Sequence, residues 1–152
     1  MRRAWLFNRQ RARRLDRSQW RRLTRCLLED LLGRREYELG VHLVGAEEMA
    51  RLNRQFLGHE GSTDVLTFNY QDNPAGEKLH GEIFISVDDG LENARRFRVR
   101  WPWEVARYLV HGILHLEGCQ DSDPVLRRAM KRRENKLLKE LSRRLDLGRL
   151  ES

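Results

Sequence analysis

Residues 111–123 read His111-Gly112-Ile113-Leu114-His115-Leu116-Glu117-Gly118-Cys119-Gln120-Asp121-Ser122-Asp123. Two histidines four residues apart on a helix lie one above the other, so both imidazoles can reach one point. Gly118 can take the left-handed conformation that ends the helix, and Asp121 can then approach the same point. Two histidine nitrogens and a carboxylate, with a fourth position open, are typical of a catalytic zinc site. The sequence therefore predicts that His111, His115 and Asp121 bind one Zn²⁺ per chain, rather than that two histidines lie by chance in a buried helix.

The sequence also predicts the secondary structure on either side of this motif. Pro102 suits the first turn of a helix, and the apolar residues that follow it predict that the helix is buried. Asp123 followed by Pro124 is an N-cap pattern that opens a long basic helix to about residue 145. Because Asp123 has this capping role, Asp121 is the better candidate for the third ligand. Cys119 is a further candidate ligand, although packing in the turn is the better explanation.

The rest of the chain alternates strand and helix patterns. Strands are predicted at 4–8, 37–44, 63–70 and 79–87, and helices at 19–32, 46–56 and 90–98. Ser18 is the expected N-cap of the first helix, and Asp88 or Asp89 that of the third. Residues 71–78 contain Asn-Pro and Gly and predict a turn. His42 falls on the polar side of its strand, so we expect it to be solvated.

Composition favours a single intracellular domain spanning residues 1–152. No apolar run is long enough to span a membrane, and the arginine-rich start lacks the apolar core of a signal peptide, although an organellar presequence stays open. Cys26 lies on an apolar helical stripe and is expected in the core. With only two cysteines there is no disulfide framework, which favours the cytoplasm.

Charge is distributed very unevenly along the chain. Residues 1–35 hold 12 arginines against 3 acids, and residues 127–149 hold 10 basic residues against 3 acids. Residues 36–126 hold 8 basic residues against 16 acids. Two basic ends thus flank an acidic middle that contains the metal motif. Such ends attract polyanions, and a phosphate backbone is the obvious candidate, while solvated helix faces are the simpler alternative.

The metal motif differs from that of zinc peptidases at one informative position. A cation with an open position lowers the pKa of bound water and polarises a phosphoryl or carbonyl oxygen, so hydrolysis is the natural chemistry. In zinc peptidases the residue after the first histidine is the glutamate that serves as general base. Here that residue is Gly112. The basic flanks favour a phosphodiester over a peptide as substrate.

The chain resembles the YbeY family of bacterial metal-dependent endoribonucleases, which act in ribosomal RNA maturation. The family signature His-Gly-x-Leu-His-Leu-x-Gly-Tyr-Asp-His is matched by residues 111–121, with differences at its end. Two segments upstream also match. They are Leu52–Phe56 followed by Thr63–Phe68, and Gly81–Ser86, which resembles the family strand Gly-Asp/Glu-Ile-x-Ile-Ser. Together the resemblance covers about residues 5–140.

The resemblance implies an α+β fold, in which a mixed, roughly four-stranded sheet packs with about five helices and a zincin-like helix carries the metal site. It implies a zinc-dependent endoribonuclease in which His111 and His115 are catalytic. The expected substrate is single-stranded RNA at the 3′ end of 16S ribosomal RNA, with the small ribosomal subunit as a further partner. No membrane and no nucleotide cofactor are expected, and the location is cytoplasmic.

The chain departs from the family pattern at two positions. Asp121 stands where the family has its third histidine, and a carboxylate is a valid zinc ligand that leaves the site one charge less positive. Leu57 stands where many members carry an arginine thought to handle RNA. Contact with phosphate would then fall to His59, to Arg95 and Arg96, or to the arginines near the chain ends.

Two other functions remain open at this stage. The chain could be a non-catalytic RNA-binding factor of ribosome assembly with a structural metal, or, with less support, a zinc peptidase. The general base is also unassigned. Glu82 and Glu117 are candidates, although Glu117, two residues after His115, should face away from the metal.

Overall fold

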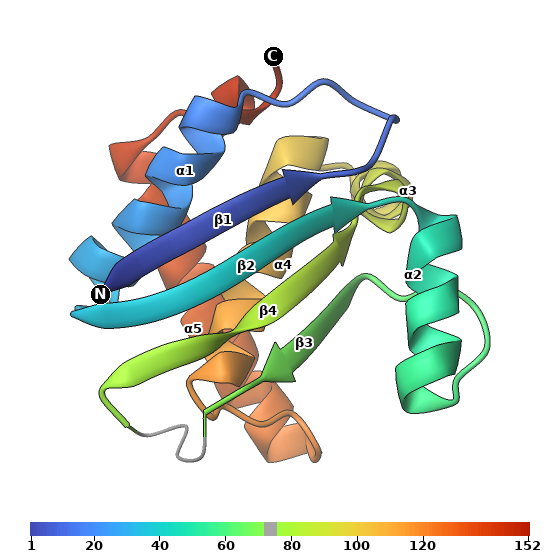
Figure 1. The fold of residues 1–152 in the computed structure, drawn as a ribbon. Coiled ribbons are helices and arrows are strands. Elements are labelled where there is room, and N and C mark those ends of the chain that lie inside the picture. Colours follow the sequence, from blue (N-terminus) through green and yellow to red (C-terminus); the bar gives the residue numbers. More distant parts are fainter. Residues whose placement is uncertain (72–75) are drawn as a thin grey trace.

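A mixed four-stranded sheet organises the computed structural model, which describes residues 1–71 and 76–152 (Figure 1). The strands are β1 (Arg2–Asn8), β2 (Glu36–Val44), β3 (Val65–Asn69) and β4 (Lys78–Ser86), in the spatial order β1-β2-β4-β3. β1, β2 and β4 run parallel, and β3 is antiparallel to β4. The predicted α+β class and the mixed sheet are confirmed. Residues 72–75, half of the turn predicted at 71–78, lie outside the described residues.

Helices cover one face of this sheet (Figure 1). The described chain forms the helices α1 (Arg17–Arg25), α2 (Ala46–Leu52), α3 (Val87–Phe97), α4 (Trp101–Leu116) and α5 (Pro124–Arg144), with short helical turns η1 (Cys26–Leu31), η2 (Asn53–Leu57) and η3 (Leu147–Leu150). α1, α4 and α5 share one core with the sheet, and α3 packs beside α4. Among the described residues, no helix is both long and apolar enough to cross a membrane.

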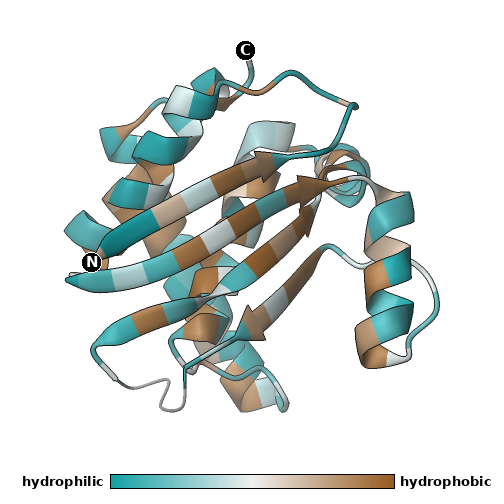
Figure 2. Cartoon of the chain, in the orientation of Figure 1, coloured by the Kyte–Doolittle hydropathy of each residue, from teal (hydrophilic) through white to brown (hydrophobic). Residues whose placement is uncertain are grey.

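Side chains alternate between the two faces of the sheet, as Figure 2 shows by its alternating apolar and polar bands. Leu39 and Val41 of β2 and Ile83 of β4 point into the helix-covered core and are almost fully buried. Cys26 lies in the same core, as predicted. The opposite face carries aromatic side chains, of which Trp5 is 44% exposed. α4, which carries two of the three candidate ligands, therefore packs on the face of the sheet that the helices cover.

Two glycines let α4 approach β4 closely. A Cβ atom at Gly112 would lie 2.8 Å from the side chain of Ile83, and one at Gly81 would lie 2.5 Å from the carbonyl oxygen of Phe68. Neither distance is compatible with a side chain unless the backbone or the neighbour moves. Gly112 is thus a contact point between helix and sheet, and position 112 faces Ile83. The absence of a glutamate there has a packing cause as well as a chemical consequence.

Two helix starts differ from the sequence prediction. The N-cap of α1 is Asp16, whose carboxylate accepts from the backbone N–H of Gln19 at 3.1 Å, and not Ser18. The N-cap of α3 is Ser86, whose hydroxyl accepts from the N–H of Asp89, and not Asp88 or Asp89 itself. In both cases the cap is earlier than predicted, because an alternative capping residue stood two or three positions upstream. Asp123 caps α5 as predicted, accepting from the N–H of Leu126 at 2.8 Å.

The prediction that His42 is solvated is wrong. His42 is 8% exposed, and its ring is stacked between Phe7 and Phe84 at centroid distances of 4.7 and 4.1 Å. Its Nε2 lies 2.8 Å from Glu82 and its Nδ1 lies 3.1 Å from Arg9. Burial lowers the pKa of His42, and the hydrogen bond and charge of Glu82 only partly oppose this effect. The polar side of β2 is therefore covered by side chains of its neighbours.

Candidate metal centre

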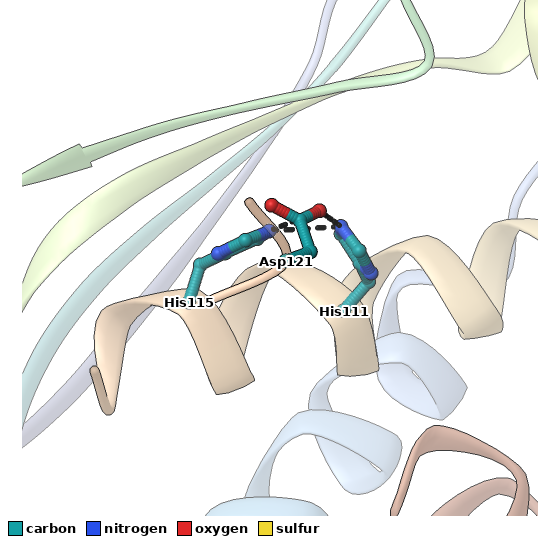
Figure 3. A group of neighbouring side chains, drawn as sticks. All are labelled: His111, His115 and Asp121. Carbon is teal, nitrogen blue, oxygen red and sulfur yellow. Dashed lines mark hydrogen bonds and ion pairs between the residues drawn. The ribbon is translucent and has the colours of Figure 1, made fainter. Parts of the chain in front are cut away.

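The three predicted ligands meet at the C-terminal end of α4 (Figure 3). The Nε2 atoms of His111 and His115 are 3.0 Å apart, and the Asp121 carboxylate lies 3.8 and 3.4 Å from them. Both imidazoles rise from one side of α4, and Asp121 faces them from the segment that follows the helix (Figure 3). This group is the only cluster of three such side chains among the residues that the structure describes. Cys119 is not part of it.

The end of α4 places these groups by backbone geometry. Gly118 has a φ of +100°, which lets the chain reverse immediately after the helix. The N–H of Gly118 donates to the carbonyl oxygen of His115, and that of Cys119 donates to Leu114, each at 3.0 Å. This turn carries Asp121 back over the helix that it has just left. The role predicted for Gly118 is confirmed.

The Nδ1 atoms of both histidines face acceptor oxygens. His111 Nδ1 lies 2.5 Å from the carboxylate of Glu134 on α5, and His115 Nδ1 lies 3.0 Å from the carbonyl oxygen of Cys119. Each acceptor favours the tautomer that carries its proton on Nδ1, which leaves a lone pair on Nε2. Histidines that bind metals are oriented in this way. Both Nε2 lone pairs are therefore directed at the space beside Asp121.

The spacing of these atoms fits a shared cation. Two nitrogens bound tetrahedrally to zinc at 2.0–2.1 Å would lie about 3.3 Å apart, close to the 3.0 Å between the two Nε2 atoms. Asp121 supplies the third, oxygen ligand, and it is partly exposed, so the fourth side is open to solvent. Nitrogen and carboxylate donors with one open position suit a catalytic transition metal better than a closed structural one.

Glu134 is the functional residue that sequence reasoning missed. It is 7% exposed, and it lies on the buried stripe of α5 with Met130, Leu137 and Leu141. Burial on its own would lower the pKa of His111, but the hydrogen bond and charge of Glu134 outweigh this effect, so the pKa is raised. A signal was available in the sequence, because a lone acid within an apolar helical stripe needs a partner.

A cavity of about 670 Å³ opens beside the metal ligands, between the end of α3, the first half of α4, and α5. His111 and Asp121 form one part of its wall. Three further carboxylates line it, those of Asp64, Glu104 and Glu134. Glu104 is 6% exposed, and burial raises its pKa although Arg107 opposes the effect. The cavity thus combines acidic groups with the metal ligands.

The two carboxylates considered as general base do not line this cavity. Glu82 bonds to His42 and to the hydroxyl of Tyr70, both on the sheet face opposite the helices. Glu117 is engaged by Arg34 at 2.9 Å, beyond the last turn of α4. Their side chains are committed to these partners, which removes them as groups acting at the metal.

The residues expected to contact RNA are dispersed. His59 lies in the exposed loop after η2, and its backbone N–H donates to the carbonyl oxygen of Asn53. Arg95 and Arg96 are exposed in the last turn of α3, where Arg96 lies over the ring of Phe97. Phe97 lines the cavity, but neither arginine is part of its wall, and nor is His59. Their contact with RNA stays a prediction.

Comparison with known proteins identifies close relatives over most of the chain. A family model described as Endoribonuclease YbeY matches residues 6–142. The Endoribonuclease YbeY of Bacteroides thetaiotaomicron is 39% identical over 106 residues, which cover 70% of this chain and 75% of that protein. The one from Chlorobaculum parvum is 44% identical over 91 residues, covering 60% and 62%. The solution structure of TM1509 from Thermotoga maritima is 25% identical with a TM-score of 0.66, covering 91% of this chain and 89% of that one.

Proposed function

This chain belongs to the YbeY endoribonuclease family, and on that basis we propose that it is a zinc-dependent enzyme that cleaves single-stranded RNA during ribosomal RNA maturation. The observation that carries the proposal is the convergence of the His111 and His115 Nε2 atoms with the Asp121 carboxylate, next to a cavity that His111 and Asp121 line. The 3′ end of 16S ribosomal RNA, in the context of the small ribosomal subunit, is the proposed substrate. The whole chain, residues 1–152, would act as one catalytic domain.

The protein residues have separable roles in this reaction. His111, His115 and Asp121 would hold one Zn²⁺, which when bound supplies a Lewis acid for the phosphoryl oxygen and activates the attacking oxygen. Glu134 and the carbonyl oxygen of Cys119 keep both imidazoles in the ligating tautomer. The substitution of Asp for the family histidine at position 121 preserves a valid ligand, so metal binding should persist.

We assign proton transfer to the carboxylates of the cavity wall. Glu104 lies seven residues before His111 on α4, about 10 Å along the helix axis, which is too far for direct transfer at the metal. Asp64 comes from the segment before β3 and lines the cavity together with His111 and Asp121. Asp64 is therefore the better candidate for the general base. An Asp64→Asn variant should bind metal but cleave RNA at least 100-fold more slowly.

Several features favour RNA over a peptide as substrate. Position 112, which carries the general base in zinc peptidases, is a glycine packed against Ile83. α5 displays a long run of exposed basic side chains, including Arg127 and Lys131 at the cavity. A polyanionic strand would be attracted to this helix. The two free cysteines, Cys26 and Cys119, fit the reducing cytoplasm proposed for this activity.

The test is cleavage of labelled RNA by zinc-loaded wild type and by the His115→Ala and Asp121→Ala variants, each with and without a chelator. Single-stranded RNA carrying the 3′ end of 16S ribosomal RNA is compared with an unrelated single strand and with a duplex. We expect cleavage of single strands that is lost in His115→Ala and on chelation. Metal analysis of protein purified without a nickel column identifies the resident ion.

One outcome would replace the enzyme proposal by the non-catalytic one. If metal-loaded wild type cleaves no RNA above the His115→Ala background but still binds it, the chain is an RNA-binding assembly factor with a structural metal. Salt titration of that binding is then informative, because phosphate contacts weaken steeply with ionic strength. Binding that does not respond to salt would exclude the basic surface of α5 as the contact.

A further inference from the structure

The cavity beside the metal ligands has the dimensions of a ligand site. Its volume of about 670 Å³ lies within the 300–1,000 Å³ of typical small-molecule pockets. It extends from His111 and Asp121 along α4 and α5 toward the segment that joins α3 to α4. Metal chemistry needs only a small part of this space. The remainder adjoins the position of the reacting group and is open to whatever the substrate presents next to it.

Away from the metal ligands, the cavity wall is largely apolar and aromatic. Its apolar side chains are Phe97, Val99, Trp103, Met130 and Leu138. Phe97 is 62% exposed and Val99 is 46% exposed, so the mouth presents apolar groups to water. Arg98 between them has a φ of +57°, a left-handed conformation that non-glycine residues rarely adopt. Arg98 is the C-cap of α3, a position where the left-handed conformation is common, and the turn that it makes places both of its neighbours at the cavity.

The positively charged side chains of the cavity differ in their partners and in their distance from the apolar wall. Arg107 is engaged by Glu104 and Glu134, at 3.5 and 3.8 Å. Arg127 and Lys131 on α5 are exposed, and neither pairs with a carboxylate among residues 1–71 and 76–152. Arg127 also donates to the backbone oxygen of Asp121, which places it at the metal end. Arg100 also lines the cavity, but its guanidinium lies against Gly148. Of the two cations on α5, Arg127 thus lies at the metal end, and the aromatic wall lies beyond it.

This order corresponds to the order of groups in a nucleotide. We propose that the cavity is a subsite for an unstacked nucleobase adjacent to the scissile phosphate, with Trp103 and Phe97 stacking the base and Arg127 and Lys131 contacting phosphate. The proposal rests on the RNA-cleaving function proposed above. Aromatic side chains beside a basic track are the general means of holding single-stranded RNA, because every base has a π face. A duplex would be excluded, since its bases cannot leave the stack without a cost.

The base contribution can be measured without cleavage. The full-length, ¹⁵N-labelled, zinc-loaded protein is titrated with adenosine 5′-monophosphate and, separately, with ribose 5-phosphate, which has the same phosphate but no base. We expect the indole N–H signal of Trp103 to move with the first compound only. Stacking of one base should make adenosine 5′-monophosphate bind roughly 5- to 150-fold more tightly than ribose 5-phosphate.

Two variants and one control locate the effect. Trp103→Ala should weaken the binding of adenosine 5′-monophosphate at least fivefold and leave the affinity for ribose 5-phosphate unchanged. Phe97→Ala should act in the same direction, and its 62% exposure makes misfolding a minor concern. Trp5→Ala is the matched control, because Trp5 is a partly exposed tryptophan on the opposite face of the sheet. Equal affinity for the two compounds, no detectable binding of either, or equal losses in Trp103→Ala and Trp5→Ala would each overturn the proposal.

The same variants separate this proposal from the proposed function. In RNA cleavage, Trp103→Ala and Phe97→Ala should raise KM with little change in kcat, because the base is bound equally in ground and transition states. If adenosine 5′-monophosphate binds as expected but wild type cleaves no RNA, the subsite stands and the nuclease proposal fails. If RNA is cleaved and the two compounds bind equally, the nuclease proposal stands and the subsite fails.

Discussion

Replacement of Glu134 by Gln tests whether metal binding depends on a carboxylate that is not itself a ligand. Glu134 lies 23 residues after His111, and its Oε2 lies 2.5 Å from His111 Nδ1. Gln keeps the size of the side chain and an acceptor oxygen but removes the negative charge. His111 should therefore remain oriented while its Nε2 becomes a weaker donor to a cation. The variant separates charge from packing at this contact.

The expected size of the effect follows from the surroundings of the contact. Loss of such a partner commonly lowers metal affinity by about 10- to 100-fold, or ~1.4–2.7 kcal/mol. Glu134 is 7% exposed, so water cannot readily take its place, which favours the upper part of this range. Arg107 lies 3.8 Å from the other carboxylate oxygen and already balances part of the charge, which lowers the effect. We expect a loss of roughly 30-fold, equivalent to about 2 kcal/mol.

The assay is competition for zinc between the protein and a chromophoric chelator, followed by RNA cleavage over a range of zinc concentrations. Cleavage by Glu134→Gln should recover at saturating zinc, since all three ligands remain. Glu140→Gln is the matched control, because Glu140 lies on the same helix and pairs with Arg143 at 2.8 Å at the surface. The reasoning is refuted if Glu134→Gln, folded as judged by thermal unfolding, binds zinc within twofold of wild type.

Three further predictions concern stability and RNA binding. Gly81→Ala should lower the free energy of unfolding by about 1–3 kcal/mol or more, because its Cβ would lie 2.5 Å from the carbonyl oxygen of Phe68. Urea denaturation measures the loss of stability, and a variant that unfolds at the wild-type midpoint would contradict the prediction. The pKa values of His42 and Glu82 are both lowered by folding, so the unfolded chain binds more protons on acidification. The contribution of these two groups to stability should therefore be complete above the ordinary histidine pKa of 6.5 and decline as the pH falls below it, first through His42 and, below about 4.5, through Glu82. His42→Gln should flatten the decline between pH 6.5 and 4.5 in urea midpoints measured across this range, and an unchanged slope would show that His42 does not cause it. Lys131→Ala should reduce the slope of log affinity against log salt by about 0.7 for single-stranded RNA, as measured by fluorescence anisotropy; an unchanged slope would remove Lys131 from the phosphate contacts.

The grouping of the three candidate ligands was predictable because their geometry is local. His111 and His115 are one helical turn apart, and Gly118 with its φ of +100° reverses the chain within the next three residues. Asp121 therefore reaches the ligand position whatever the rest of the fold does. Asp123 caps α5 for the same reason, since an N-cap bond spans three residues. All these relations lie within a segment of thirteen residues.

The wrong prediction for His42 concerns a residue whose environment comes from distant segments. The alternation in β2 correctly separates its two faces but cannot say what covers them. His42 is covered by Phe7, 35 positions earlier, and by Phe84, 42 positions later, because parallel pairing places these strands on either side of β2. The helix caps at Asp16 and Ser86 were misplaced for a different reason. Neighbouring polar residues have nearly equal capping propensity, and packing decides among them.

The sequence by itself determined the class of the fold and the family, and it predicted the group of three candidate ligands that the structure brings together, because periodicity, capping and a one-turn spacing act over short stretches of chain. Only the tertiary structure decided which groups surround these three side chains. It brought Glu134 from α5 to His111, left Glu82 and Glu117 bound to other partners, and placed Trp103 in the wall of the cavity that His111 and Asp121 also line. These contacts depend on the packing of α3, α4 and α5 against one another, and such packing is set by the volumes and shapes of many distant side chains together.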